Sequence, residues 1–360
     1  MWGAGGATAA ADSGADGDDF VAEAKAKVEA ATQPASTWDG PTSGPAAQAD
    51  KLIVYVASDL RNGGVLGVSK GVEEAAKAIG WEAQVLDGQG TVSGRTAALN
   101  QAITLQPNGI ILGGFDAVEQ QAGIEQAAGQ GIPIVGWHAA ANPGPIEGTP
   151  VFANVATDAN DVAQIAALYA VAQSDGKAGV IVFTDSAFSV AIAKSDAMAA
   201  VIKQCAGCTL LSVEDTPLAD TSTRMPQLVT SLLQRYGEEW TYSLGINDLY
   251  FDFGGPALAT AGKSPEGPPY NLSAGDGSEA AYQRIRENQF QAGTVPEPLN
   301  LHGWQLVDEL NRAFAGEQWS GYITPVHLVT PDNIEFDGGP NNVYDPDNGY
   351  RDEYKKIWGK

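Results

Sequence analysis

The chain has 360 residues, with 20 Lys and Arg against 44 Asp and Glu, and a formal net charge of -24. Such an acidic surface repels nucleic acid and anionic lipid, which argues against both as partners. Hydrophobic residues make up 44% of the chain and charged residues 18%, so the composition indicates packed globular domains, and the length favours two of them. No apolar run reaches the roughly 18 residues that a membrane helix needs.

Residues 1–50 are expected to form an extension rather than a domain. They carry one helical pattern, over residues 20–31, followed by a lead-in rich in Pro, Gly and Ser. The first twenty residues lack both the basic and the apolar region of a secretory signal. Their Ala-rich texture is typical of an exported protein whose signal has been removed, so we expect a periplasmic or other extracytoplasmic location.

From residue 51 on, strand and helix patterns alternate. Residues 51–57 form a β-branched apolar run typical of a buried strand, and residues 65–79 repeat apolar positions at helical spacing before Gly80. The loop between them, residues 58–64, is small, polar and glycine-rich. It follows the carboxyl end of a parallel strand, where open α/β sheets bind ligands, so we expect it to bind something polar.

The alternation continues through two similar halves. Further strands are expected at 83–86, 109–112, 132–137, 151–155, 178–183, 209–213, 241–246 and 270–273. Helices are expected between them at 93–105, 117–129, 162–172, 190–202, 223–236 and 255–261, and late elements at 280–287, 303–315 and 326–329. This pitch predicts parallel sheets with right-handed crossovers, and therefore an α/β fold in two tandem halves.

Several of these segments together resemble the sugar-binding proteins of bacterial ABC importers, of the ribose-binding type. The likeness is carried, in order over residues 51–330, by VYVASDLRNGG, GVEEAAKAIGW, GIILGGFDA, GIPIVGWHAA, SLGIND and SAGDGS. The resemblance implies two doubly wound parallel-sheet, Rossmann-like domains joined by a three-segment hinge, the type I periplasmic binding protein fold. The domains would be residues 51–155 plus 298–325 and residues 156–297 plus 326–335, followed by a C-terminal extension, residues 336–360.

The same resemblance implies a binding protein and not an enzyme. It would take up a monosaccharide or sugar alcohol between the domains by hinge closure and deliver it to a membrane permease, as a monomer without cofactor, metal or nucleic acid. Carried over position by position, the ligand-binding residues would be Ser58, Asn62, Trp137, His138, Phe188, Lys194, Asp220, Asn247, Asp276 and Glu297. Their polar groups suit vicinal hydroxyls, and the aromatic faces suit C–H groups.

The sequence also departs from the ribose-binding pattern. His138 and Ala139 stand in place of an Asp-Arg pair, and Lys194 in place of an arginine, which removes the planar fork that fixes ring hydroxyls. We therefore expect another monosaccharide or an open-chain polyol rather than ribose. Structural roles remain open for four of these residues: Trp137 as core, His138 as a surface or structural residue, Lys194 as a solvated helix residue and Asp276 as a helix cap.

The two cysteines, Cys205 and Cys208, form a C-x-x-C motif. Such a motif can be a redox pair, but redox pairs normally open a helix after a strand, whereas this one lies between a helix end and a strand. The chain has no further cysteines to complete a zinc site. We expect a short structural disulfide, which would suit an oxidising compartment.

Two other functions share parts of this pattern. Residues 62–67 resemble the glycine-rich dinucleotide loop, and Asp87 follows near the spacing of a ribose-binding acid, so a nicotinamide-dependent oxidoreductase is the main alternative. Asn62, however, replaces the glycine that makes the tight phosphate turn. The effector domain of a sugar-responsive regulator would share the fold but needs a basic DNA-binding headpiece, which the acidic first fifty residues do not provide.

The C-terminal extension lies beyond the resemblance. Residues 345–349 hint at a calcium loop, but the glycine comes too early and no suitably spaced Glu closes the pattern. We interpret the extension as a turn-rich strap on the surface.

Overall fold

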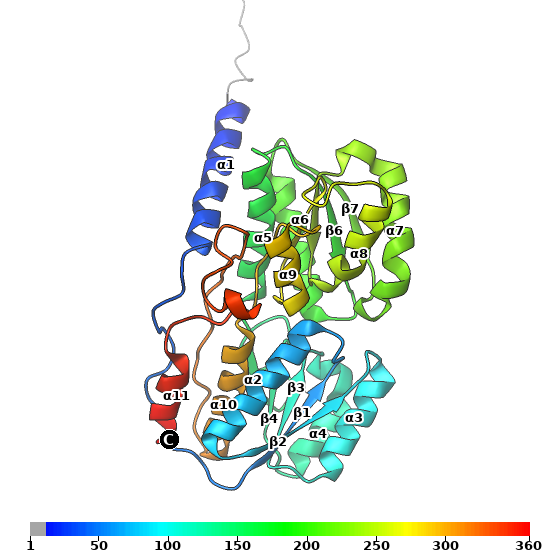
Figure 1. Ribbon diagram of the computed structural model, residues 1–360. Coiled ribbons are helices and arrows are strands. Elements are labelled where there is room, and N and C mark those ends of the chain that lie inside the picture. The colour runs from blue at the N-terminus through cyan, green and yellow to red at the C-terminus, as the bar shows by residue number, and fades with distance from the viewer. Residues whose placement is uncertain (1–11) are drawn as a thin grey trace, which may run out of the picture.

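The structure is a computed structural model in which residues 12–360 are described, with side chains described from residue 16 on. Within this range the strands form two parallel five-stranded sheets, in the orders β2-β1-β3-β4-β5 and β10-β9-β8-β6-β7. Figure 1 shows each sheet with its helices in a separate lobe, one above the other, and we call these the first lobe and the second lobe in chain order. This architecture confirms the predicted fold class.

The sheet of the first lobe is covered by helices on both faces. Its elements are β1 (Leu52–Ala57), α2 (Gly63–Ile79), β2 (Glu82–Asp87), α3 (Val92–Thr104), β3 (Gly109–Gly113), η1 (Ala117–Gln120), α4 (Gln121–Gly129), β4 (Ile134–Trp137) and β5 (Val151–Val155). Ile53 and Tyr55 of β1 pack with α2, whereas Val54 and Val56 pack with α3 and α4. Because both faces are buried, the strand is a continuous apolar run.

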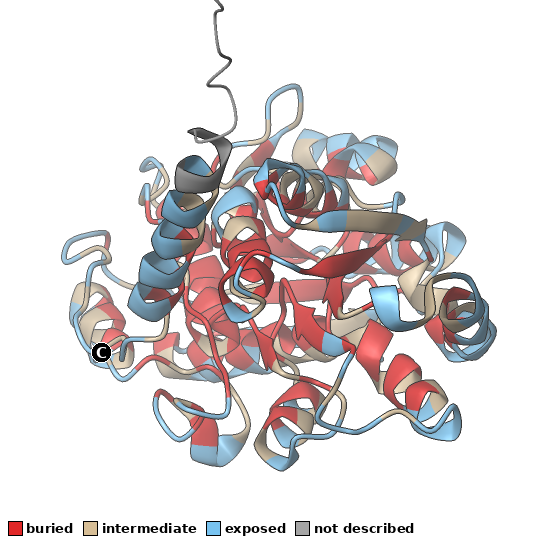
Figure 2. Cartoon of the chain, turned by 90° about the horizontal axis from the view of Figure 1, so that it is seen from above, coloured by how far each residue is buried: buried red, intermediate tan, exposed pale blue. Residues whose placement is uncertain are grey.

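The second lobe repeats this design around one larger core. Its elements are α5 (Ala159–Gln173), β6 (Gly179–Thr184), α6 (Ser189–Gln204), β7 (Thr209–Asp215), η2 (Leu218–Asp220), α7 (Thr221–Tyr236), η3 (Gly237–Glu239), β8 (Tyr242–Gly245), α8 (Leu249–Thr260), β9 (Tyr270–Ser273), α9 (Glu279–Glu287) and β10 (Gly293–Thr294). Figure 2 shows the buried residues gathered on the strands and on the inner faces of the helices. The lobe therefore has a core of its own.

The chain then returns to the first lobe as α10 (Leu299–Phe314), which packs against α2. A β-carbon on Gly303 would collide with the backbone of Gly71, so the two helices lie with their backbones in contact. Beyond α10 the chain crosses back to the second lobe. The late element expected at residues 326–329 is reduced there to an isolated antiparallel bridge between Val329 and Thr294.

The N-terminal extension contacts both lobes. Helix α1 (Asp12–Ala31) packs on α5 of the second lobe through Ala24, Val28 and Ala31, which are spaced to share one helix face. The following lead-in runs along the first lobe, where the ring of Trp38 packs against Tyr322 and Tyr354. Figure 1 shows α1 beside the second lobe, on the same side of the molecule as the C-terminal helix.

The C-terminal extension also passes from the second lobe to the first. Tyr344 belongs to an apolar cluster of the second lobe, after the short η4 (Gly339–Asn341), while α11 (Tyr350–Trp358) packs on the first lobe. Trp358 stacks on Trp304 at 5.4 Å between ring centroids and donates from Nε1 to Asp308 Oδ1 at 2.8 Å. The prediction of a surface strap is therefore wrong for its last part, because the aromatic face of α11 is buried.

Cys205 and Cys208 are joined by a disulfide at the end of α6, directly before β7. This confirms the predicted pairing. Among the described residues, no helix is long and apolar enough to cross a membrane, and no group of three His, Cys, Asp or Glu side chains is placed to hold a metal ion.

Candidate functional site

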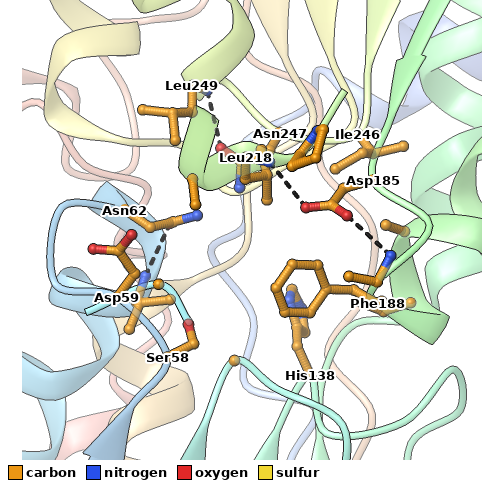
Figure 3. A pocket seen from close by; sticks show the side chains of 18 of the residues that line it. Ser58, Asp59, Asn62, His138, Asp185, Phe188, Leu218, Ile246, Asn247 and Leu249 are labelled. Atoms are coloured by element: carbon orange, nitrogen blue, oxygen red, sulfur yellow. Dashed lines mark hydrogen bonds between the residues drawn. The ribbon is translucent and has the colours of Figure 1, made fainter. Parts of the chain in front are cut away.

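A cavity of about 220 Å³ lies between the two lobes, at the carboxyl ends of the strands of both sheets. Eight predicted site residues line it: Ser58, Asn62, Trp137, His138, Phe188, Lys194, Asn247 and Asp276. Figure 3 shows Ser58 and Asn62 on one side, Leu218 and Asn247 on the other, and the ring of Phe188 directed toward the open space between them. The parallel strands thus bring loops from far apart in the sequence to one place.

Asp220 does not line this cavity. It ends η2, its side chain is 48% exposed, and Oδ2 lies 3.5 Å from Nη2 of Arg224 on the next turn of helix. Leu218 and Ala219 of the same short helix face the cavity instead. The prediction chose the polar residue of the segment, but the geometry of the turn places the apolar ones inside.

Glu297 lies directly behind the cavity and is fully buried. Its Oε1 is 3.2 Å from Nε2 of His138, and its Oε2 accepts a hydrogen bond from the amide of Thr157 at 3.1 Å. Burial alone would raise the pKa of Glu297, but the imidazoles of His138 and His302 hold the pKa below its usual range. The carboxylate therefore positions His138 rather than facing the cavity itself.

Asp276 is the central polar group of the cavity. Its Oδ2 accepts a hydrogen bond from Nδ2 of Asn247 at 2.8 Å, and its Oδ1 lies 3.8 Å from Nδ1 of His138. Burial raises the pKa of Asp276, while the nearby His138 and Lys194 act against the rise. The alternative role as a helix cap is not observed, because Ser278 caps α9.

Lys194 is buried at 2% exposure, so it is not the solvated helix residue that the sequence left open. Its ammonium donates to the carbonyl of Ala274 at 2.7 Å, in the loop that carries Asp276. An ammonium has three donors, and this contact uses one of them. The side chain also lines the cavity, so the other donors are placed to meet a ligand.

Asn62 has two functions at the start of α2. Its Oδ1 accepts hydrogen bonds from the amides of Gly64 and Val65 at 3.0 and 3.3 Å, which caps the helix. The amide nitrogen then remains as the free donor end of the side chain, and Figure 3 shows it directed toward the cavity. The helix cap therefore fixes the donor in place.

Trp137 ends β4 and His138 directly follows it, with their rings stacked 3.9 Å apart between centroids. Trp137 is 1% exposed, so it is a core residue as well as a lining residue. Its Nε1 donates to Nδ1 of His302 at 3.0 Å. Burial lowers the pKa of His302 to about 4, so this imidazole is neutral near pH 7 and its Nε2 carries the proton.

The polar network behind Trp137 joins the three segments that connect the lobes. Nε2 of His302 lies 2.8 Å from Oγ1 of Thr324, which lies 2.7 Å from Oγ1 of Thr157. The amide of Thr157 in turn donates to Glu297. Thr157 lies between β5 and α5, Glu297 between β10 and α10, and Thr324 in the segment after α10. These are the three segments in which the chain crosses between the lobes, so one buried network ties all three together. We call these residues, with His302, the hinge network.

Three charged residues of the lining, Asp59, Arg95 and Asp185, were not among the ten predicted site residues, although Asp59 lies in the loop expected to bind something polar. Arg95 forms a two-point ion pair with Glu119 and lies over the ring of Phe188, and its carbon Cζ is 5.7 Å from the ring centroid. Each of the three stands in or just after a loop that follows a strand, which is the signal that could have found them. All three are paired within the protein, as described further below.

The lobes also touch beside the cavity. Asp116 of the first lobe accepts hydrogen bonds from the amide and the hydroxyl of Ser189, at the start of α6 in the second lobe. On another side of the cavity, the backbone of Gly63 and Gly64 packs directly against the loop of Asp276 and Ser278. The lobes are therefore in contact on two sides of the cavity.

Comparison with solved structures shows the same fold in several proteins. They include GanP, a glucose-galactose binding protein from Geobacillus stearothermophilus (17% identity, TM-score 0.69, 79% of this chain and 99% of that one). A sugar ABC transporter protein from Yersinia enterocolitica aligns over 88% of this chain and 100% of its own at 18% identity and a TM-score of 0.71. An Agrobacterium vitis ABC transporter solute binding protein, solved with bound allitol, aligns over 79% and 97% at 19% identity and a TM-score of 0.66.

No curated protein matches the sequence. A family model does: the periplasmic binding protein domain matches residues 53–318, which include both sheets, the lining of the cavity and the return helix α10. The match to a family of binding proteins also agrees with the prediction that the chain is not an enzyme. Because the match extends over most of the chain, the protein belongs to the periplasmic binding protein family.

Proposed function

We propose that the protein binds a monosaccharide or sugar alcohol in the cavity between its lobes, closes around it by hinge motion, and delivers it to a membrane permease of an ABC importer. The observation that carries this proposal is the set of donors and acceptors around Asp276. Asn62, Lys194, Asn247 and His138 line the same cavity as this carboxylate, and Asn247 donates a hydrogen bond to it. Vicinal hydroxyls, each donor and acceptor, complement such an arrangement.

A glucose-galactose binding protein and a solute binding protein with bound allitol are among the structural neighbours, which supports the same ligand class. The lobes that would move are those predicted from the sequence, residues 51–155 plus 298–325 and residues 156–297 plus 326–335. The ligand would stabilise the closed arrangement because groups from both lobes contact it only there. We further propose that the protein acts outside the cytoplasm as a monomer, and the Cys205–Cys208 disulfide suits an oxidising compartment.

The dinucleotide-binding alternative is not favoured by the loop that suggested it. The amides of Gly64 and Val65, which would meet a phosphate, are bonded to Oδ1 of Asn62. Gly63 is covered by Ser278 of the second lobe. A pyrophosphate would have to displace both contacts.

Isothermal titration against pentoses, hexoses, alditols and NAD(H) tests the proposal. We expect at least one sugar or alditol to bind, and NAD(H) not to bind. Asp276→Ala and Asn247→Ala should each weaken that binding at least about tenfold, roughly 1.4 kcal/mol. Asp220→Ala is the matched control, because this carboxylate lies outside the cavity, and it should bind like the wild type. Unchanged affinity in both cavity variants, or binding of NAD(H) alone, would contradict the proposal.

A further inference from the structure

The cavity is lined by two chemically different sets of side chains. The polar set is the group around Asp276 described above. The second set belongs to the second lobe and consists of Phe188, Val190, Leu218, Ala219, Ile246 and Leu249. We call these six residues the apolar wall. They come from the segments that follow β6, β7 and β8, so three neighbouring strands of one sheet contribute to the wall.

Asp185, the charged residue closest in sequence to Phe188, is used to build the wall. Its Oδ1 accepts from the amide of Ala187 and its Oδ2 from the amide of Leu218, both at 2.9 Å. Figure 3 shows these two bonds, which run from one carboxylate to two different loops. Asp185 thus joins the loop that carries Phe188 to the loop that carries Leu218. A carboxylate that already accepts two backbone hydrogen bonds has little capacity left for a ligand hydroxyl.

The other charged groups of the lining on the first-lobe side are paired in a similar way. Nε and Nη2 of Arg95 donate to Glu119, at 2.8 and 2.6 Å. Asp59 accepts from Nε and Nη2 of Arg61 at 3.0 and 2.8 Å. These contacts use part of the hydrogen-bonding capacity of both side chains, whereas Lys194 and Asn62 of the polar set keep donors for a ligand.

From these two sets of lining residues we infer that the ligand is amphipathic: a sugar or polyol whose hydroxyls meet the polar set and whose apolar group, such as a deoxy methyl or an alkyl or aryl substituent, rests on the apolar wall. This inference rests on the proposed function and narrows its ligand class. A hydroxyl placed against the wall would give up its hydrogen bonds to water without replacement, which weakens binding by about tenfold or more. A methyl or aryl group there gains from burial instead.

Calorimetry on matched pairs of ligands tests the inference. Suitable pairs are D-galactose with D-fucose, L-mannose with L-rhamnose, and D-glucose with methyl and phenyl glucosides. Within at least one pair, we expect the member with the apolar group to bind about tenfold more tightly. If sugars bind but the fully hydroxylated member of every pair binds as tightly or more tightly, the inference is overturned while the proposed function stands. If no member of any pair binds, the proposed function fails and the inference with it.

Variants then assign the preference to the wall. Leu218→Asn introduces a polar group of similar size at a position whose backbone is held by Asp185, so it should reduce the preference for the apolar member to less than about threefold. Val213→Asn changes an exposed residue of β7 in the same way and should leave the preference intact. Circular dichroism and the melting temperature confirm that both variants are folded. An unchanged preference in folded Leu218→Asn would overturn the role of the wall.

Discussion

Gly64 of the first lobe and Asp276 of the second lie so close together that a β-carbon on Gly64 would overlap the Asp276 carboxylate. The glycine stands at the N-terminal end of α2, and the carboxylate is the central polar group of the cavity. The two glycines after Asn62 are therefore explained by the close packing of the two lobes and not by phosphate binding. It allows the loop of one lobe to rest on the helix end of the other.

If the proposed function is correct, Gly64→Ala should obstruct closure of the two lobes and weaken ligand binding at least about tenfold, although glycine has no side chain that could contact the ligand. Titration calorimetry measures the affinity, and small-angle X-ray scattering measures whether ligand still compacts the protein. Gly129→Ala is the control, because a β-carbon there meets nothing within 4 Å. Wild-type affinity in Gly64→Ala would show that the lobes close differently from the arrangement described here.

A second prediction concerns the hinge network. Thr324→Val keeps the shape of the side chain but removes the hydroxyl that joins His302 to Thr157. The imidazole nitrogen would then be buried without a partner, so we expect the free energy of unfolding to fall by about 1–3 kcal/mol. Urea denaturation followed by tryptophan fluorescence measures the change. Thr260→Val, which alters an exposed helix position, should change stability by less than about 0.5 kcal/mol.

A third prediction concerns the C-terminal helix. Trp358→Ala removes the stack on Trp304 and the hydrogen bond to Asp308, so it should lower the free energy of unfolding by about 3–5 kcal/mol. Phe336→Ala serves as the control, since Phe336 is exposed and its loss should have little effect. Chemical denaturation compares both variants with the wild type. Equal stability of Trp358→Ala and the wild type would mean that α11 is not docked as described.

A fourth prediction concerns pH. Burial raises the pKa of the Glu309 carboxyl from 4.5 to about 7, although the amide and hydroxyl of Ser320 donate to it. Between these values the folded protein holds a proton that the unfolded chain has lost. The free energy of unfolding contributed by this group therefore falls as pH rises from 4.5 to 7, by up to about 3 kcal/mol.

Glu309→Gln should abolish that loss, so the variant should be more stable than the wild type at pH 8 and close to it at pH 4.5. Denaturation at several pH values gives the comparison. Glu317→Gln, at an exposed position nearby, should leave the pH profile unchanged. His302 acts in the opposite sense: its pKa of about 4 makes stability fall as pH drops below 6.5, and this contribution is common to all three proteins.

The fold was accessible from the sequence because buried parallel strands and amphipathic helices leave strong local patterns. The run at residues 51–57 and the spacing of Val65, Val68 and Val72 identify β1 and α2 within a few residues. The loops at strand ends were accessible for the same reason, since topology places them on one edge of the sheet. Eight of the ten predicted residues consequently lie around one cavity; whether they bind ligand stays a prediction.

The remaining features depend on contacts between distant parts of the chain. Leu218 and Leu249 look like ordinary core residues in sequence, and only the enclosed cavity shows that they line a ligand-sized space. The aromatic residues of α11 alternate with charged ones, so the sequence pattern alone indicates a solvated tail. Only the structure shows that Trp358 stacks on Trp304. Asp220 lies outside the cavity for a similar reason, because polarity alone does not tell which side of a short helix faces inward.

The two extensions have a consequence for how far the lobes can separate. Besides the three crossings of the hinge, the chain passes between lobes after α1 and again before α11, and the two extra passages are hydrogen bonded to each other through the amide of Ala35 and Oδ2 of Asp337. Both lie on the same side of the molecule in Figure 1. Each is anchored by packed aromatic residues or a packed helix in both lobes, so wide opening would stretch or undock it. We therefore expect a small amplitude of opening, so that the width of the opening rather than the depth of the cavity would set the upper limit on ligand size.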